Sequence, residues 1–182
     1  MANLKALLQR LVEKDVEFVV IGAFASVAHG VTIVTQDVDI CCPFTSRNLM
    51  KLQAALAELH PVHRLTPKHL PLQLTREKCR GLKNLYLETD LGVLDCLREV
   101  LGVGSFAAVK KQSVVIDLGF GKCRVLGLDA LIKAKRAMGR PRDREAVIQL
   151  EAIRARQHRR HARRRLLPNR PLPQTPLTDA LE

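Results

Sequence analysis

Two aspartates, Asp37 and Asp39, stand two positions apart in an apolar segment of this 182-residue chain. On an extended strand such residues point to the same face, roughly 7 Å apart along the backbone. Upstream, Gly22 follows the hydrophobic run 18–21 and offers a turn whose backbone N–H groups could bind phosphate. Two carboxylates that face such a turn indicate a metal-assisted phosphate site.

A simpler interpretation of these residues is structural. Asp37 would cap a turn, Asp39 would be solvated at the edge of a sheet, and Gly22 would serve only as a strand–helix turn. The apolar residues between and after the two acids favour the metal interpretation, because acids on a buried strand need a partner.

The chain before the aspartates predicts a helix, a strand and a second helix. Apolar residues at helical spacing predict an amphipathic helix over residues 3–14. Residues 17–21 do not alternate, which is typical of a strand covered on both faces. Gly22 then allows a sharp exit into a helix of small residues over 23–29. The strand that carries the aspartates ends before Pro43.

The rest of the chain predicts hairpins and helices around an irregular connection over 60–75, which contains three prolines and three histidines. Strands are predicted over 84–88, 93–97, 113–118 and 122–126, and helices over 47–59, 106–110, 128–138 and from Pro141 to about Gln157. This order predicts one α/β (α+β) domain with a mixed sheet over residues 1–157. Residues 158–182, rich in Arg and Pro, are predicted to be a disordered tail.

Composition excludes several other classes of protein. Hydrophobic residues make up 47% of the chain, yet no apolar run approaches the roughly 20 residues of a membrane span. Five cysteines without a CxxC pair argue against both a disulfide framework and a structural zinc site. Cys41 and Cys42, in an apolar stretch beside the acids, are interpreted as reduced packing residues. These observations predict a cytoplasmic protein with no membrane partner.

The net charge of +12 is concentrated near the C-terminus. Residues 154–170 hold eight arginines and no acid, so 22 basic and 18 acidic residues remain elsewhere. The basic stretch could bind RNA phosphates in a salt-dependent manner, but it lacks aromatic residues for base stacking. A generic polyanion-binding or merely solubilising tail fits the sequence equally well.

Four segments occur in the order typical of the minimal nucleotidyltransferase superfamily: GAFASVAHG, TQDVDI, YLETDLGVLDCL and GLDALIKAKRAMGRPRD. Over about residues 1–152 the chain resembles that superfamily, and more narrowly its small proteins of the AbiEii or MNT toxin type. The resemblance implies a nucleotidyltransferase-type mixed sheet flanked by helices, with C-terminal helices and a basic tail. It also implies a glycine at a helix start, an Asp-x-Asp strand and a later third carboxylate, which correspond here to Gly22–Ala23, Asp37–Asp39 and Asp95.

Glu88 and Asp90 are the alternatives to Asp95 as the third carboxylate. Asp95 shares a predicted strand face with Val93 and Leu97, whereas Asp90 falls in a turn. An acid among apolar residues is harder to explain as a surface residue, so Asp95 is preferred.

The resemblance implies a role for each of these residues. Mg²⁺ or Mn²⁺ held by Asp37, Asp39 and Asp95 would clamp the attacking and leaving oxygens of an NTP substrate. Asp95 would also activate the incoming hydroxyl, as a base or through the metal. Backbone N–H groups of Gly22 and Ala23 would bind the triphosphate. Further phosphate contacts are expected first from Lys135 and then from Arg140, although each also fits a solvated helix face.

The implied function is Mg-dependent transfer of a nucleotidyl group from NTP to a hydroxyl of RNA, tRNA or protein, by the toxin of a toxin–antitoxin pair. Two residues depart from the family pattern: Ala23 replaces a usual Ser or Gly, and Ile33 a common Arg. They motivate an alternative, a catalytically degenerate nucleotide- or RNA-binding member of the same fold. A third hypothesis is transfer to the hydroxyl of a drug. Asp143 is expected to cap the last helix or to pair with an arginine.

Overall fold

The computed structural model describes residues 2–166, without the side chains of residues 161 and 163–166. Its centre is a seven-stranded mixed sheet in the order β3-β4-β5-β2-β1-β9-β8. These strands are β1 Val19–Ile21, β2 Asp37–Cys41, β3 Val62–His63, β4 Asn84–Thr89, β5 Gly92–Leu97, β8 Ser113–Asp117 and β9 Lys122–Leu126. The pairs β2–β5 and β1–β9 are parallel, and the other neighbours are antiparallel.

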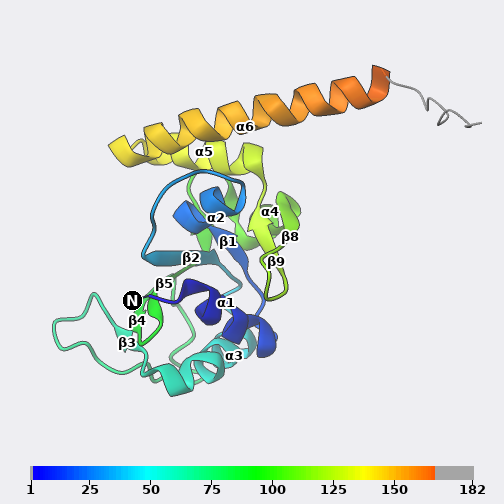
Figure 1. Ribbon diagram of the computed structural model, residues 1–182. Helices are drawn as coiled ribbons and strands as arrows, with labels where there is room; N and C mark the ends of the chain where they lie inside the picture. Colours follow the sequence, from blue (N-terminus) through cyan, green and yellow to red (C-terminus); the bar gives the residue numbers. More distant parts are fainter. Residues whose placement is uncertain (1, 167–182) are drawn as a thin grey trace, which may run out of the picture.

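Helices cover this sheet and close both ends of the molecule. They are α1 Leu4–Glu13, α2 Gly22–Ala28, α3 Ser46–Leu56 followed by the 3-10 turn Ala57–Leu59, α4 Phe106–Lys111, α5 Leu128–Met138 and α6 Pro141–Leu166. In Figure 1, α5 and α6 lie side by side at one end of the molecule, while α1 and α3 pack together at the other. The short α2 lies between α5 and the sheet, and Gly22 at its start lines a cavity together with Lys135 of α5.

The helices α1, α3 and α5 form where the spacing of their apolar residues predicts them. The predicted stripe of α1 is buried through its four leucines, and α3 is capped by Thr45, whose side chain accepts a hydrogen bond from the Asn48 N–H at 3.3 Å. Gly139 ends α5 in the left-handed conformation. All five cysteines are buried and free, which agrees with the packing role predicted for Cys41 and Cys42. In the described residues, no helix is long and apolar enough to cross a membrane.

The predicted mixed α/β fold with flanking helices is confirmed, and three local features differ from the sequence-based expectations. The last helix continues to Leu166, past the predicted end near Gln157, because Arg and Ala favour helix and no Pro or Gly interrupts them. The predicted tail over 158–182 therefore begins as helix, and residues 167–182 lie outside the described part. A two-stranded ribbon, β6 Glu99–Val100 with β7 Gly104–Ser105, and the short strand β3 were not predicted.

Candidate functional site

The register of the sheet brings the predicted carboxylates together. Asp39 on β2 is the direct neighbour of Asp95 on β5 and of Ile21 on β1. Asp37 is two residues before Asp39 on the same strand, so all three acids belong to one face of the sheet. β2 is a central strand, which excludes the simpler interpretation of Asp39 as an acid at a sheet edge.

Gly22 is required by the position of Asp39. It begins α2 with a φ of +66°, a conformation that favours glycine. A Cβ added to Gly22 would lie 1.9 Å from Oδ2 of Asp39. The Asp39 carboxylate therefore lies directly against the glycine backbone, and the sequence alone had left this coupling open.

The charge of Asp39 is only partly compensated. Burial, together with the negative charges of Asp37 and Asp95, raises the pKa of Asp39 from 3.8 to about 6. Arg140 and Lys135 oppose this rise without cancelling it. The site thus holds a partly buried carboxylate that favours a bound proton or cation near neutral pH.

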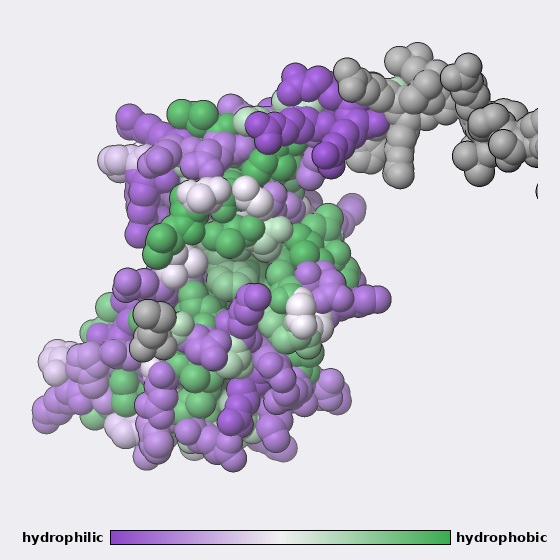
Figure 2. Space-filling view, in the orientation of Figure 1, coloured by the Kyte–Doolittle hydropathy of each residue, from purple (hydrophilic) through white to green (hydrophobic). Residues whose placement is uncertain are grey.

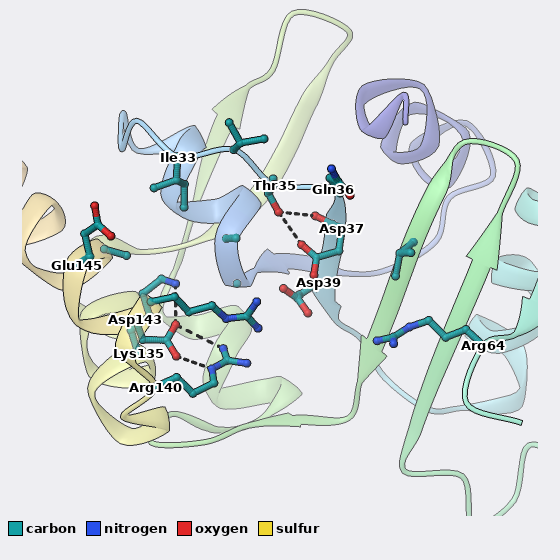
Figure 3. A pocket seen from close by; sticks show the side chains of 16 residues that line it. Ile33, Thr35, Gln36, Asp37, Asp39, Arg64, Lys135, Arg140, Asp143 and Glu145 are labelled. Atoms are coloured by element: carbon teal, nitrogen blue, oxygen red, sulfur yellow. Dashed lines mark hydrogen bonds and ion pairs between the residues drawn. The ribbon is translucent and has the colours of Figure 1, made fainter. Parts of the chain in front are cut away.

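Thr35 holds Asp37 in place. Its hydroxyl lies 2.6 Å from Oδ1 of Asp37 and 3.2 Å from the Asp37 carbonyl oxygen, so it can donate to either. Figure 3 shows this contact at the cavity wall beside Asp39. No role was predicted for Thr35, although this residue begins the TQDVDI segment.

Asp95 has a partner that the sequence did not predict. Arg64 donates from Nε to Oδ1 of Asp95 at 3.1 Å and from Nη2 to Oδ2 at 2.6 Å. Hydrogen bonding to Asp95 raises the pKa of the Arg64 guanidinium further, in spite of partial desolvation. Arg64 lies in the connection predicted over 60–75, which has no periodicity, so no sequence signal could have placed this residue against β5.

The predicted phosphate contacts lie across the cavity from Arg64, on α5 and the turn that follows it (Figure 3). Lys135 Nζ is 3.2 Å from Oδ1 of Asp143, and Arg140 Nε is 2.6 Å from Oδ2. Burial alone would raise the pKa of Asp143, but hydrogen bonds from Arg140 and Lys135 outweigh it and lower the pKa. The predicted pairing of Asp143 with an arginine is confirmed, and Asp143 fixes both cations beside the acids.

Two adjoining cavities of about 530 and 400 Å³ share these charged residues. Both are lined by Gly22, Asp37, Asp39, Arg64, Lys135 and Arg140. The larger cavity also contains Ala23 and Ile33, so the apolar replacement at position 33 lies at the cavity wall. The smaller cavity adds an apolar wall of Leu97, Val100, Leu101, Leu131 and Met138. The space is large enough for a polar phosphate group on one side and an apolar group on the other.

The residues present fit a divalent ion at Asp37 and Asp39. Mg²⁺ prefers a few carboxylates together with waters and phosphate oxygens, and both acids line a cavity where such ligands could enter. In the described part of the chain, no group of three or more His, Cys, Asp and Glu side chains is arranged to hold a metal. The third predicted ligand, Asp95, has both oxygens hydrogen-bonded to Arg64. Its role as a metal ligand stays a prediction.

No family model matches the sequence, and no curated protein matches it at a significant level. Solved nucleotidyltransferases have a similar fold. The crystal structure of ANT(2")-Ia in complex with adenylyl-2"-tobramycin is 16% identical, with a TM-score of 0.52 over 87% of this chain and 96% of that one. Its solution structure is 17% identical, with a TM-score of 0.50 over 90% and 93% of the two chains.

A protein of Thermotoga maritima assigned as a nucleotidyltransferase is 18% identical to this chain. Its TM-score is 0.51, and the match covers 80% of this chain and 88% of that one. At such identities the likeness concerns the fold, which is the one predicted from the sequence. The narrower resemblance to AbiEii or MNT toxins stays a prediction.

Proposed function

We propose that this chain transfers a nucleotidyl group from an NTP to a hydroxyl acceptor, with Mg²⁺ or Mn²⁺ as cofactor. The observation that carries the proposal is the placement of Asp39. Its incompletely compensated carboxylate lies against Gly22, beside Asp37, in a cavity bordered by Lys135 and Arg140. The nucleotidyltransferase fold of the solved neighbours supports the same chemistry.

Different residues of the site bind the ion and position the phosphates of the NTP. Asp37 and Asp39 hold the ion, which when bound neutralises charge on the phosphates. Lys135 and Arg140, fixed by Asp143, donate to phosphate oxygens of the NTP. The backbone N–H groups of Gly22 and Ala23 are the predicted contacts of the triphosphate, at the start of α2. These contacts align the α-phosphorus for attack from the acceptor side.

The transfer itself is a displacement at the α-phosphorus. A bond forms from the acceptor oxygen to that phosphorus, and the bond to the bridging oxygen breaks, so pyrophosphate leaves with the electron pair. The hydroxyl proton passes to solvent. Asp95, the predicted base, accepts hydrogen bonds from Arg64 at both of its carboxylate oxygens.

The far half of α6 supports RNA among the predicted acceptors. Residues 152–166 contain no acid, and Arg156, Arg159 and Arg160 are exposed. Figure 2 shows hydrophilic side chains along this part of the helix. An exposed arginine-rich helix attracts a phosphate backbone without reading its sequence. A protein acceptor, an antitoxin partner, a toxin role and a cytoplasmic location are proposed on the resemblance alone.

Incubation with labelled NTPs, Mg²⁺ and one acceptor at a time tests this proposal. The acceptors are total RNA, protein from a cell extract, and tobramycin, because a tobramycin adduct is bound in one solved neighbour. We expect label on RNA with the wild-type chain and its loss with Asp39→Asn. Absence of transfer to any acceptor, or equal transfer by the variant, would contradict the proposal.

A second candidate function is binding without turnover. Three features favour it: Ala23, Ile33 and the Arg64–Asp95 ion pair, which engages the third predicted carboxylate. Equilibrium dialysis with labelled NTP separates the two functions. Mg²⁺-dependent binding with no product in any acceptor assay would support the degenerate form.

A further inference from the structure

Asp39 and Asp95 are neighbours in the sheet but have different partners. They pair in register on the parallel strands β2 and β5. The Asp39 carboxylate lies against the backbone of Gly22, whereas both oxygens of Asp95 accept hydrogen bonds from Arg64. The positive charge that compensates Asp95 therefore comes from the chain itself.

Arg64 is held in position from several sides. Its backbone N–H donates to the Tyr86 carbonyl at 3.0 Å, and its guanidinium carbon lies 5.5 Å from the centroid of the Tyr86 ring. Tyr86 is also the register partner of Asp95 on β4. The Asp95 side chain is 12% exposed and that of Arg64 30%, so water screens the pair only partly. Two-point contacts between Arg and a carboxylate are among the strong polar interactions in proteins.

The pair also borders the space in which we place the phosphates. Arg64 lines both cavities, together with Asp37 and Asp39. Asp95 uses the Nε and Nη2 donors, which leaves the donors on Nη1 for another acceptor. A fixed cation at this position can stabilise negative charge on a transferring phosphoryl group, as a second metal ion would.

We propose that Arg64 takes the place of a second divalent ion. It keeps Asp95 out of metal coordination, so the site binds a single ion through Asp37 and Asp39. This inference rests on the proposed function, because it assumes the ion at those two acids. A purely structural ion pair is the competing explanation, and it predicts no change in metal stoichiometry when Arg64 is replaced.

Electron paramagnetic resonance of Mn²⁺ bound to the full chain, without nucleotide, tests the inference. We expect one ion per wild-type chain with the spectrum of an isolated Mn²⁺. Arg64→Met should bind a second ion, with the spin coupling of two ions about 4 Å apart. Arg64→Lys keeps the positive charge and should bind one ion.

Two further variants control for charge and for Asp95. Arg142→Met removes a positive charge from the same cavities at an exposed residue, and it should still bind one ion. The double variant Arg64→Met/Asp95→Asn should return from two ions to one. Circular dichroism confirms that each variant is folded before it is titrated.

Asp95→Asn on its own provides an independent test that does not depend on the folding of Arg64→Met. We expect its Mn²⁺ affinity to stay within about twofold of wild type, because Asp95 is not a ligand. Two coupled ions in the wild type, one ion in folded Arg64→Met, or a tenfold loss of affinity in Asp95→Asn would each overturn the inference. Absence of bound Mn²⁺ from the wild type would overturn the proposed function as well, which separates the two failures.

Discussion

Asp39 and Asp95 are adjacent carboxylates of one sheet, but their negative charges are compensated to different degrees. Both lie on central strands, in direct register and on the same face. Arg64 donates to Asp95 at 2.6 Å, whereas Asp39 lies against Gly22, whose missing side chain leaves room for the carboxylate. Asp39 retains a pKa of about 6 because burial and two like charges outweigh Lys135 and Arg140.

The difference is between an acid that is paired with a fixed arginine and an acid that can still bind a cation. A buried carboxylate without full compensation costs free energy unless a cation or proton joins it. Proteins keep such arrangements mainly where function needs them. We therefore propose that the ion binds at Asp39 and Asp37, and that Arg64, held by Asp95, supplies the second positive charge.

The largest expected effect distinguishes the two acids directly. Asp39→Asn should reduce nucleotidyl transfer by roughly a thousandfold or more, since it removes a proposed ligand of the ion. Asp95→Asn should reduce it by only about tenfold, because it disturbs the position of Arg64. Asp90→Asn, in the β4–β5 turn, is the control and should be fully active. Equal losses for Asp39→Asn and Asp95→Asn in the labelled-NTP assay would remove the distinction.

The variant Gly22→Ala tests whether the Asp39 carboxylate, unlike that of Asp95, requires a glycine beside it. Left-handed strain and the clash with Oδ2 of Asp39 should together lower the free energy of unfolding by roughly 2–5 kcal/mol. Gly81→Ala is a matched control, since Gly81 has a φ of +83° but no atom within 4 Å of an added Cβ. It should cost only about 1–2 kcal/mol of strain in urea unfolding. Equal destabilisation by the two variants would mean that Asp39 does not constrain Gly22.

The pKa of Asp39 predicts how stability depends on pH. The folded pKa of about 6 exceeds the ordinary value of 3.8, so the folded state retains a proton that the unfolded state releases. This contribution to stability is complete below about pH 4 and is lost as the pH rises through 6, by about 3 kcal/mol in total. The variant Asp39→Asn should not lose stability in this way, because an asparagine side chain does not titrate.

Urea unfolding of the two chains at pH 4 and pH 8, without divalent ions, measures the effect. The stability of Asp39→Asn relative to wild type should be higher at pH 8 than at pH 4. Mg²⁺ at pH 8 should then stabilise the wild type and leave the variant unchanged. A stability difference that is independent of pH would show that Asp39 is fully compensated.

A smaller effect, on the KM for NTP, is expected from a substitution at Asp143 on the other side of the cavity. Asp143→Asn removes the charge that fixes Lys135 and Arg140, so KM for NTP should rise about tenfold, with a smaller change in kcat. Asp129→Asn is the control, because Asp129 is an exposed acid of α5 that pairs with Arg154. An unchanged KM in Asp143→Asn would place the phosphates away from these cations.

The smallest expected effect concerns the acceptor and lies outside the carboxylate site. Arg159→Gln on α6 should weaken RNA binding a few-fold and reduce the salt slope of log Kd by about 0.7–0.9. Lys5→Gln, which removes an exposed charge from α1, should change neither quantity. Fluorescence anisotropy with a labelled RNA at several salt concentrations measures both. Identical slopes for the wild type and Arg159→Gln would remove the support for RNA.

The sequence was sufficient to predict those elements whose residue pattern repeats with the period of a helix or a strand. Spacing of apolar residues located the helices, and alternation placed Asp37 and Asp39 on one strand face. The structure adds what register and packing decide: the adjacency of Asp39 and Asp95, and the contact of Asp39 with Gly22. Neither follows from local pattern, because each joins segments far apart in the sequence.

Arg64 shows the same limit most clearly. It lies in a stretch rich in proline and histidine with no periodicity, and only the pairing of β3 with β4 brings it to Asp95. The extension of α6 was missed because two sequence signals conflict in this segment. The Arg-rich composition predicted a disordered tail, although Arg is a good helix former and the segment is helical to Leu166.

The most direct test of the difference between Asp39 and Asp95 is an anomalous difference map from crystals grown with Mn²⁺ and a non-hydrolysable NTP analogue. We expect one peak, between Asp37 and Asp39, with the Arg64–Asp95 hydrogen bonds intact. A peak coordinated by Asp95, with Arg64 turned away from it, would contradict the account.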